Sequence, residues 1–278
     1  MQGKGHFKKL HNYYKASEYG YEFFLDGAQH FGFYPEGKKI SEKEAQILMQ
    51  DLIGKKLSLK PSMKALDAGC ARGVVASYLA KKFGCRIEAI DALPFLIQKA
   101  RKRAKMNGIS GKVNFSVMDY SKLKFGSNSF DAIYSMETLC HSPEIRKTIK
   151  GFYRVLKEKG RVVFFEYSIG EDDEFSVYEM KMLDVIIRSS AVAGLKEFRH
   201  NNFQNVIKSA GFKNVKVDNI SKNVSASVGR YWKYAFIPYY LVKPFGLQEK
   251  FPNLTIAIEW HSMAKKGLMK YKIFTAEK

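Results

Sequence analysis

A loop with two glycines near residue 70 has the composition of a cofactor-binding turn. The stretch ALDAGCARG at residues 65–73 lies between a short apolar run and an amphipathic stretch, as a turn between a strand and a helix does. Glycine in such a turn lets a ligand approach the backbone, and the first N–H groups of the helix face an anionic or polar group. Gly69 and Gly73 lack the G-x-G-x-x-G spacing of a dinucleotide site, because Ala71 and Val74 occupy the other positions. We therefore expect a small polar cofactor other than NAD or FAD; the alternative is a purely structural turn.

Acidic residues end the next two predicted strands. Asp91 lies 18 residues after Gly73, where a carboxylate can accept hydrogen bonds from two ribose hydroxyls. Asp119 and Tyr120 end the following strand, where a carboxylate can accept from an adenine amino group and the neighbouring ring or amide can meet the base. Each aspartate alone is more often a turn or cap residue. Three successive strand ends that carry this set favour the cofactor interpretation.

A second polar pair follows the fourth predicted strand. Glu137 and His141 lie in the segment SMETLCHSP at residues 135–143, at the carboxyl edge of the sheet where sites in α/β proteins open. If this segment is helical, the spacing of four puts both side chains on one face, where they can form an acid-base pair. Otherwise they are polar loop residues. Glu137 and His141 are our catalytic candidates.

The hydrophobic pattern of residues 63–168 indicates the strands and helices that must position these residues. Five apolar runs, from KALDAGC at 64–70 to RVVFFEYS at 161–168, are separated mainly by Lys-rich amphipathic stretches. This alternation predicts a parallel sheet covered by helices on both faces. Gly84, Gly108 and Gly160 each follow an amphipathic stretch, and we expect each to end a helix in the left-handed conformation.

These motifs resemble those of the class I S-adenosylmethionine-dependent methyltransferases. DAGCARG is similar to their Asp-x-Gly-x-Gly-x-Gly motif, EAID to their acidic second-strand end and MDY to their adenine contact, with Ala71 where the family usually has glycine. The resemblance implies an α/β fold, a Rossmann-like seven-stranded sheet with helices on both faces, in a methyltransferase domain over residues 62–278. It implies S-adenosylmethionine as the cofactor, bound by Asp67, Gly69, Cys70, Gly73, Asp91, Ala92, Asp119 and Tyr120.

Segments on either side of this frame are expected to cover the site. Residues 1–61 form a predicted N-terminal lid and helical segment, with aromatic residues gathered at 7–34. Within it, Ser41 with Glu44 three residues later predicts the capped start of a helix. Two insertions, at about residues 169–200 and 222–266, are predicted caps.

The segment SMETLCHSP also resembles the sterol, tocopherol and prenyl-diphosphate C-methyltransferase branch of the family, whose corresponding segment carries a Glu and a His-Ala/Ser-Pro ending. EYGYEFF and HFGFY resemble the aromatic N-terminal segment of that branch. Methyl transfer from a sulfonium to an alkene carbon leaves a carbocation, which aromatic faces stabilise and a carboxylate such as Glu137 can deprotonate. For any single ring, packing of a cap helix is the alternative role. The predicted substrate pocket comprises Tyr14, Tyr19, Tyr21, Phe31 and Tyr231.

The net charge and the cysteine residues limit which partners we expect for the protein. The chain has 278 residues and a formal net charge of +20, which favours anionic partners, but it has no dense basic tail, so we expect no nucleic acid. Residues 228–247 combine basic and aromatic side chains, a composition suited to a cap or to shallow contact with an anionic membrane interface. Cys70, Cys85 and Cys140 lack metal-ligand spacing, and we expect no metal. With no spanning segment and no secretory signal, we expect a cytoplasmic protein, membrane-peripheral if residues 228–247 meet lipid.

The sequence thus predicts an enzyme that methylates a small, largely apolar acceptor, prenyl-lipid or sterol-like, at carbon. An N- or O-methyltransferase of a small metabolite is one alternative, with Glu137 or His141 as the base on the nucleophile. An RNA methyltransferase would account for the charge, but the chain lacks an Asn/Asp-Pro-Pro-Tyr signature and an appended RNA-binding module. The last alternative is a fold that binds S-adenosylmethionine without catalysis, against which the set of acidic residues argues.

Overall fold

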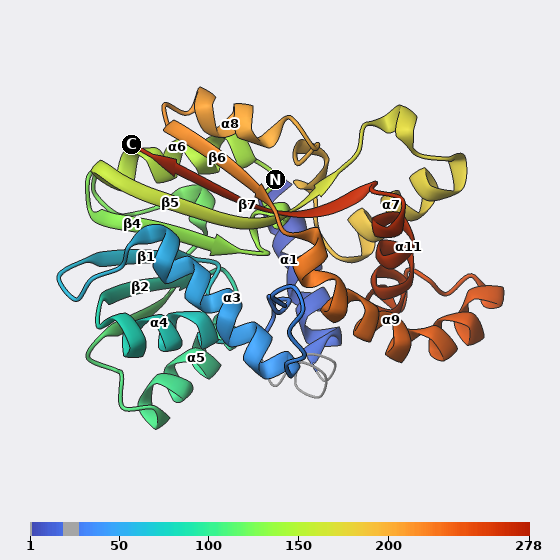
Figure 1. Ribbon diagram of the computed structural model, residues 1–278, viewed down its shortest axis with the longest axis horizontal. Helices are drawn as coiled ribbons and strands as arrows, with labels where there is room; N and C mark the ends of the chain where they lie inside the picture. Colours follow the sequence, from blue (N-terminus) through green and yellow to red (C-terminus); the bar gives the residue numbers. More distant parts are fainter. Residues whose placement is uncertain (1, 19–27) are drawn as a thin grey trace.

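The computed structural model of the protein describes residues 2–18 and 28–278. Its centre is a seven-stranded sheet in the order β3-β2-β1-β4-β5-β7-β6 (Figure 1). β7 runs antiparallel to both of its neighbours, and the other strand pairs are parallel. The strands are β1 Lys64–Ala68, β2 Arg86–Asp91, β3 Val113–Val117, β4 Phe130–Met136, β5 Leu156–Ile169, β6 Lys213–Asn219 and β7 Met269–Glu277. The predicted Rossmann-like sheet is therefore confirmed.

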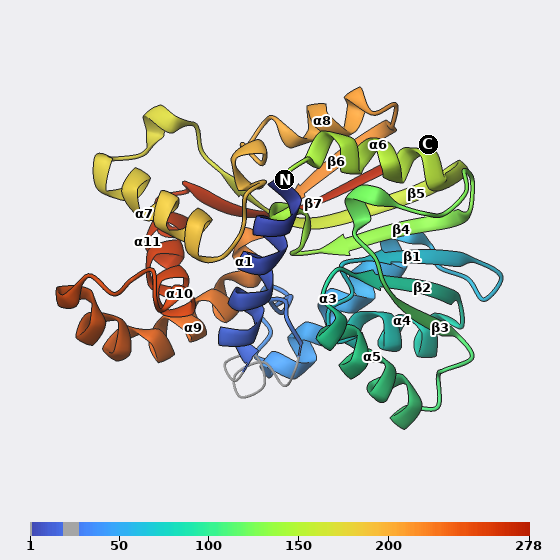
Figure 2. The same cartoon turned by 180° about the vertical axis from the view of Figure 1, so that it is seen from behind.

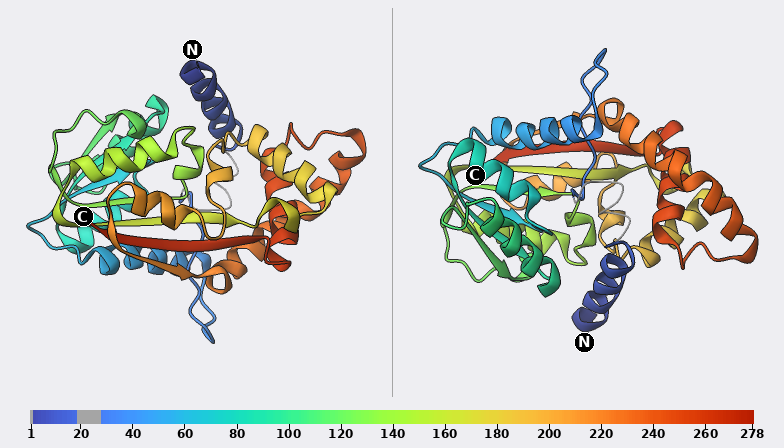
Figure 3. Two further views of the ribbon diagram at one scale, coloured as in Figure 1. Left: turned by 90° about the horizontal axis from the view of Figure 1, so that it is seen from above. Right: turned by 90° about the horizontal axis from the view of Figure 1, so that it is seen from below.

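Helices cover both faces of this sheet (Figures 2 and 3). α3 (Glu42–Leu57), α4 (Val74–Phe83) and α5 (Pro94–Met106) lie on one face, and α6 (Ile145–Val155) and α8 (Phe203–Ser209) lie on the other. The handedness of the crossovers explains this division. The chain moves from β1 to β2 in one direction across the sheet and from β4 to β5 in the other, so right-handed connections put α4 and α6 on opposite faces.

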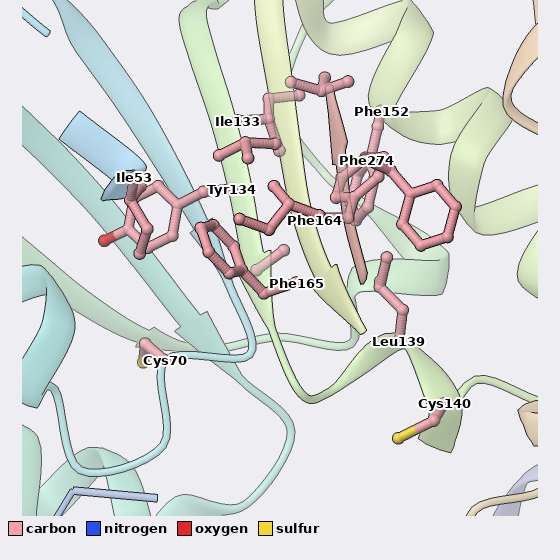
Figure 4. Close-up of a cluster of buried hydrophobic side chains, with 14 of the residues drawn as sticks. Ile53, Cys70, Ile133, Tyr134, Leu139, Cys140, Phe152, Phe164, Phe165 and Phe274 are labelled. Carbon is pink, nitrogen blue, oxygen red and sulfur yellow. The ribbon is translucent and has the colours of Figure 1, made fainter. Parts of the chain in front are cut away.

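The hydrophobic core fills the space between these layers (Figure 4). Tyr134 on β4 and Phe164 on β5 are fully buried, as are Ile53 from α3 and Phe152 from α6. The rings of Phe152 and Phe164 lie 5.8 Å apart. Because both faces of the sheet are covered, its central strands read as nearly continuous apolar runs. This packing fixes the carboxyl ends of the parallel strands, where the candidate residues lie.

Most of the expected helix boundaries are confirmed, and one is wrong. The side chains of Ser41 and Glu44 form a capping box at the start of α3. Gly84 caps α4 with φ 73°, and Gly108 follows the end of α5 with φ 65°. Gly160 does not end a helix: α6 stops at Val155, and the next residue is already in β5.

The reason for this difference lies in the first residue of β5. Leu156 is fully buried and pairs with Phe130 on β4, so the chain leaves the helix four residues before Gly160. The left-handed turn that follows is made by Lys159, with φ 61°.

A lobe of further helices lies beside the carboxyl ends of the parallel strands (Figure 1). It contains α7 (Val177–Ser189), α9 (Ser221–Val242), α10 (Pro252–Thr255), a π-helical segment (Ile256–Trp260) and α11 (His261–Lys265). Short 3-10 turns cover Tyr120–Lys122, Leu139–His141, Asp172–Glu174, Leu195–Glu197 and Lys243–Phe245. In the described part of the chain, no helix is both long enough and apolar enough to cross a membrane.

The N-terminal part of the chain contributes to two places. α1 (Gln2–Ala16) projects outward at the junction of the sheet and the lobe (Figure 3), and its Leu10 packs with Leu93 and Leu96 at the start of α5. α3, in contrast, belongs to the main core through Met49 and Ile53. The domain boundary near residue 61 stays a prediction.

Gly73 and Gly37 give a matched test of how tightly the loop before α4 packs. Their φ angles are 70° and 72°, but a Cβ on Gly73 would lie 2.6 Å from the ring of Phe115, whereas one on Gly37 would meet no atom within 4 Å. Gly37→Ala should lower the free energy of unfolding by about 1–2 kcal/mol, the cost of a left-handed L-residue. Gly73→Ala should lower it by about 1–3 kcal/mol more, because of overpacking. Urea unfolding measures both, and equal losses would contradict the tight packing of this loop.

Candidate active site

The loop after β1 is held against the end of β2. The backbone N–H groups of Gly69 and Cys70 both donate to the carbonyl of Ile90, at 2.9 Å. Ala71 takes φ 45°, a left-handed conformation where the methyltransferase motif usually has glycine, and its N–H donates to Asp91 Oδ2 at 3.0 Å. A Cβ on Gly69 would lie 2.4 Å from Thr138 Oγ1. The loop therefore packs without space for larger side chains at its turn.

Two small cavities meet at Gly69. Asp67, Gly69 and Cys70 line the first, together with residues 29–30, and this cavity sits at the end of β1. Gly69 also lines the second cavity, which extends along the ends of β2 and β3. The predicted residues in this second cavity are Asp91, Ala92, Asp119 and Tyr120. Seven of the eight predicted cofactor residues thus lie along one crevice.

Gly73, the eighth predicted residue, lies elsewhere. It is the residue before α4, and its Cα faces the ring of Phe115 and the side chain of Ala100. It lines neither of the two cavities. Its role in the structure is to let the loop turn closely against the core.

The carboxylate of Asp91 lines the crevice and accepts hydrogen bonds from the backbone. Its Oδ1 accepts from the N–H of Leu93 at 2.9 Å and its Oδ2 from the N–H of Ala71 at 3.0 Å. Burial raises the pKa of this carboxyl to about 6, so it is ionised above that pH. A carboxylate offers about four acceptor positions, and two remain for the hydroxyls of a ribose.

Asp67 has a different environment in the first small cavity. Its Oδ2 accepts from the hydroxyl of Tyr134 at 2.9 Å, and burial raises its pKa to about 8. An ammonium group bound nearby would favour the ionised carboxylate and remove part of that burial cost. Asp67 therefore suits a ligand with a cationic amino group.

Asp119 and Tyr120 both make hydrogen bonds that hold the chain beside the second cavity. The Asp119 carboxylate accepts from both the N–H and the hydroxyl of Ser121, each at 2.8 Å, and so caps the 3-10 turn at Tyr120–Lys122. The hydroxyl of Tyr120 donates to the carbonyl of Thr138 at 2.8 Å. Asp119 therefore has the capping role that was the alternative for such aspartates. Asp119 and Tyr120 nevertheless both line the second cavity.

A larger cavity of about 440 Å³ adjoins this crevice. It shares Gln29 and His30 with the first small cavity, and Tyr14 and His141 with the second. Its walls are mainly apolar and come from the sheet edge, α1, α7, α9 and residues 253–260. A ligand of the crevice and a ligand of this cavity would therefore be neighbours.

Three of the five predicted pocket residues line this large cavity. They are Tyr14, Phe31 and Tyr231, and the rings of Phe31 and Tyr231 lie 5.6 Å apart. Tyr19 and Tyr21 lie outside the described residues.

Glu137 enters this cavity from a strained turn after β4, with φ 54°. Its Oε1 accepts from the N–H of Phe31 at 2.9 Å and from the hydroxyl of Tyr271 at 2.7 Å, and its Oε2 accepts from the hydroxyl of Tyr167. Burial raises the pKa of Glu137 to about 7, although these donors favour the ionised form.

His141 faces the same cavity but does not pair with Glu137. The turn around residue 138 is irregular and only Leu139–His141 is helical, as a 3-10 turn, so the two residues share no helix face. His141 Nδ1 lies 3.1 Å from the carbonyl of Ala191, which only accepts, so this nitrogen carries the proton. Nε2 then accepts from the hydroxyl of Tyr14 at 3.1 Å. Burial lowers the pKa of His141 to about 4, which keeps the ring neutral.

Several residues of the site escaped the sequence analysis. Tyr167 lies on β5 and Tyr271 on β7. The only feature of the sequence that pointed to Tyr167 was its position near the end of the fifth predicted strand. His30 is buried, with Nδ1 2.9 Å from the carbonyl of Phe31 and Nε2 3.1 Å from the amide nitrogen of Gln50. No spacing in the sequence connects these partners.

The order of the sheet and the polar crevice beside an apolar cavity define an α/β fold with adjoining sites for two ligands. The Methyltransferase domain family matches residues 66–164. The S-adenosyl-L-methionine-dependent Diels-Alderase iliD of Neonectria sp. is 31% identical over 74% of this chain and 83% of its own length. Squalene methyltransferase 1 of Botryococcus braunii is 26% identical over 88% of this chain and 65% of its own.

A sterol methyltransferase and a cyclopropane synthase also match. Sterol 24-C-methyltransferase of Kluyveromyces lactis is 29% identical over 58% of this chain, which spans 43% of that enzyme. The cyclopropane synthase MmaA2 of Mycobacterium tuberculosis has the same fold, with a TM-score of 0.84, 15% identity and 98% coverage of both chains. The chain therefore belongs to the class I S-adenosylmethionine-dependent methyltransferases, close to the sterol C-methyltransferase branch. S-adenosylmethionine is its cofactor.

The ribose contact assigned to Asp91 can be tested with a variant that keeps its shape. Asp91→Asn should weaken the binding of S-adenosylhomocysteine by about 1–3 kcal/mol, because a charge-assisted acceptor is lost. Glu88→Gln on the same strand, at a residue that pairs with Lys64 on the protein surface, is the control and should bind normally. Calorimetry measures both affinities. An unchanged affinity in Asp91→Asn would place the ribose contact elsewhere.

Proposed function

We propose that this enzyme methylates a small, largely apolar acceptor at carbon. The observation that carries the proposal is the position of Glu137: a carboxyl group held by three hydrogen-bond donors in an apolar, aromatic cavity that adjoins the cofactor crevice. An apolar cavity of this size with a few placed polar groups is the usual form of a small-molecule site.

The aromatic residues around Glu137 suit the charge that carbon methylation creates. Bound S-adenosylmethionine supplies an electrophilic methyl group, and its transfer to an alkene leaves a positive charge on carbon. The ring of Phe31 lies 6.2 Å from that of Tyr167 and 5.9 Å from that of Tyr271, so three aromatic rings gather beside the carboxylate. Aromatic faces attract a cation, and the attraction strengthens where water is excluded.

Glu137 provides the second half of this chemistry. A carbocation nearby favours the ionised carboxylate, which can stabilise the charge and then accept a proton from the neighbouring carbon. Tyr167 and Tyr271 hold the two carboxylate oxygens in place, so the group is oriented before the acceptor arrives. His141 is neutral and its ring nitrogens are both engaged, which favours an orienting role for it.

The polar atoms of the cavity narrow the acceptor class. Within the described part of the chain, Gln29 Oε1, Ser190 Oγ and Tyr231 OH are buried, line the cavity and have no hydrogen-bond partner. Buried polar groups are normally satisfied, so these atoms favour an acceptor that carries a hydroxyl or carbonyl group. The described lining contains no Lys or Arg to meet a phosphate, which favours a neutral acceptor over a prenyl diphosphate or RNA.

A second candidate is the cyclisation of a bound polyene with the cofactor left unconsumed. Its support is the similarity to iliD, an S-adenosyl-L-methionine-dependent Diels-Alderase. Methyl-labelled S-adenosylmethionine with sterols, prenyl alcohols, prenyl diphosphates, small amines and RNA separates the candidates. We expect label in a neutral apolar acceptor. A product with the mass of its substrate and no label would support cyclisation, and label in RNA alone would overturn the substrate class.

Removing the charge of Glu137 should lower turnover but leave cofactor binding unchanged. Glu137→Gln keeps the shape of the side chain and should lower turnover at least tenfold, since an amide neither stabilises a cation nor accepts its proton. The matched control is Glu42→Gln, because Glu42 is also buried and accepts from the hydroxyls of Tyr34 and Ser227 outside the cavity. Single-turnover kinetics and calorimetry give both readouts. Normal turnover with lower thermal stability would reduce Glu137 to a structural residue.

The pH profile gives an independent test of the same role. Since burial raises the pKa of Glu137 to about 7, its carboxyl is mostly protonated below that pH and cannot accept a proton. With saturating cofactor, turnover should rise as pH increases through about 7, and the residual turnover of Glu137→Gln should lack this rise. An unchanged acid limb in the variant would assign it to another group.

A further inference from the structure

The exposed apolar side chains of this protein are concentrated in one region. Twelve large apolar residues are exposed in the described part of the chain, and nine of them come from residues 177–178 and 234–251. Ile237, Leu241 and Phe245 are 70%, 67% and 76% exposed. A contiguous exposed patch of this kind marks an interaction site. We call this surface, formed by the second half of α9 and the segment to Phe251, the apolar tip.

Helix α9 is apolar on its outer side as well as its inner side. Its inner residues Ala235 and Tyr239 are buried against Ile258. An ordinary surface helix carries polar residues opposite its buried stripe, but here Ile237 and Leu241 are exposed instead. From residue 234 to residue 245 the only charged side chain is a lysine.

Basic residues surround the apolar tip. Lys233, Lys250 and Lys265 are exposed at its edge, and Lys265 lies 6.0 Å from the ring of Trp232, which packs on Phe236. Lys243, the single lysine between residues 234 and 245, is half-buried and lies over several tyrosine rings.

The acidic residues of this region already have partners within the protein. Glu249 pairs with Arg188 at 2.6 Å. Glu259 is buried and accepts from the hydroxyl of Tyr178 at 2.7 Å. An apolar surface with tyrosines, phenylalanines and a lysine rim has the composition of a segment that lies in the interface of an anionic membrane.

The large cavity, which we call the acceptor cavity because the proposed function places the methyl acceptor there, reaches the surface at this tip. On α9 it is lined by Val228, Tyr231, Tyr234 and Pro238, a stripe that runs for about 15 Å along the helix axis. The inner end of the stripe contacts Phe31 beside Glu137, and the outer end is exposed at Tyr234 and Pro238, next to Ile237. The apolar wall of the cavity thus continues into the apolar tip.

We propose that the apolar tip docks on an anionic lipid bilayer and that the cavity takes its acceptor directly from that bilayer. The second part rests on the proposed function, since it concerns the apolar acceptor. The net charge of +20 adds a long-range attraction toward an anionic surface, and the lysine rim directs it to the tip. A bilayer therefore fits better than a second, equally basic copy of the chain.

Vesicle co-sedimentation of the full chain tests the docking without knowledge of the acceptor. The protein with S-adenosylhomocysteine should bind vesicles of phosphatidylcholine and phosphatidylglycerol at least tenfold more tightly than vesicles of phosphatidylcholine alone, and high salt should weaken the binding. Ile237→Glu with Leu241→Glu should reduce binding to anionic vesicles at least tenfold. Met106→Glu with Val117→Glu adds the same charge at exposed apolar residues outside the tip and should reduce it far less.

Two outcomes would overturn the docking surface. One is equal loss of vesicle binding in both double variants, which would make the effect one of net charge. The other is a dimer in analytical ultracentrifugation that Ile237→Glu with Leu241→Glu dissociates, without vesicle binding by the wild type; it would assign the tip to a second copy. Failure of the proposed function is separate, because a protein that methylates no apolar acceptor can still bind vesicles through this tip.

Discussion

The buried carboxylate of Glu137 and its three donors form the interaction on which the rest of the site depends. A charge placed in an apolar cavity without partners costs several kcal/mol, and such a group instead keeps its proton. The donors that reduce this cost come from three separate parts of the chain: the backbone of Phe31, Tyr167 on β5 and Tyr271 on β7. The requirement to satisfy one carboxylate therefore ties the N-terminal segment to the two strands at the edge of the cavity.

The turn after β4 that contains Glu137 is also held by a second buried acid, Glu166. Glu166 Oε1 accepts from the N–H groups of Thr138 and Leu139, at 2.8 and 2.6 Å, and burial raises the pKa of this carboxyl to about 8. Glu137, between β4 and these two amides, is held at φ 54°. Strained backbone of this kind persists only where the surroundings fix it, and it is concentrated at functional sites. The turn is rigid because donors and acceptors hold it on both sides.

The crevice and the large cavity are linked by residues that line both. Tyr14 of α1 reaches both the second small cavity and the acceptor cavity, and its hydroxyl donates to His141, which lines both as well. Gln29 and His30 line both the acceptor cavity and the first small cavity. Because residues of the N-terminal segment line all three of these cavities, movement of this segment would change the crevice and the acceptor cavity together.

The sequence by itself determined the sheet, the strand ends and the cofactor crevice, since these follow from local patterns. Apolar runs define β1 to β5, and Asp67, Asp91 and Asp119 reach one edge because parallel strands end at the same side of a sheet. Gly160 shows where local reasoning fails. A glycine after an amphipathic stretch predicts the end of a helix, but burial of Leu156 against β4 ended α6 earlier.

The acceptor cavity was decided only by the tertiary structure. The sequence picked out several of its aromatic residues, but not that Tyr167 and Tyr271 would meet Glu137, or that His141 would bond to Tyr14 instead of pairing with it. These contacts join residues 30 to 134 positions apart. A hydrogen bond between distant residues leaves no periodic trace in the chain, because it depends on which side chains the packed sheet and helices bring within about 3 Å of each other.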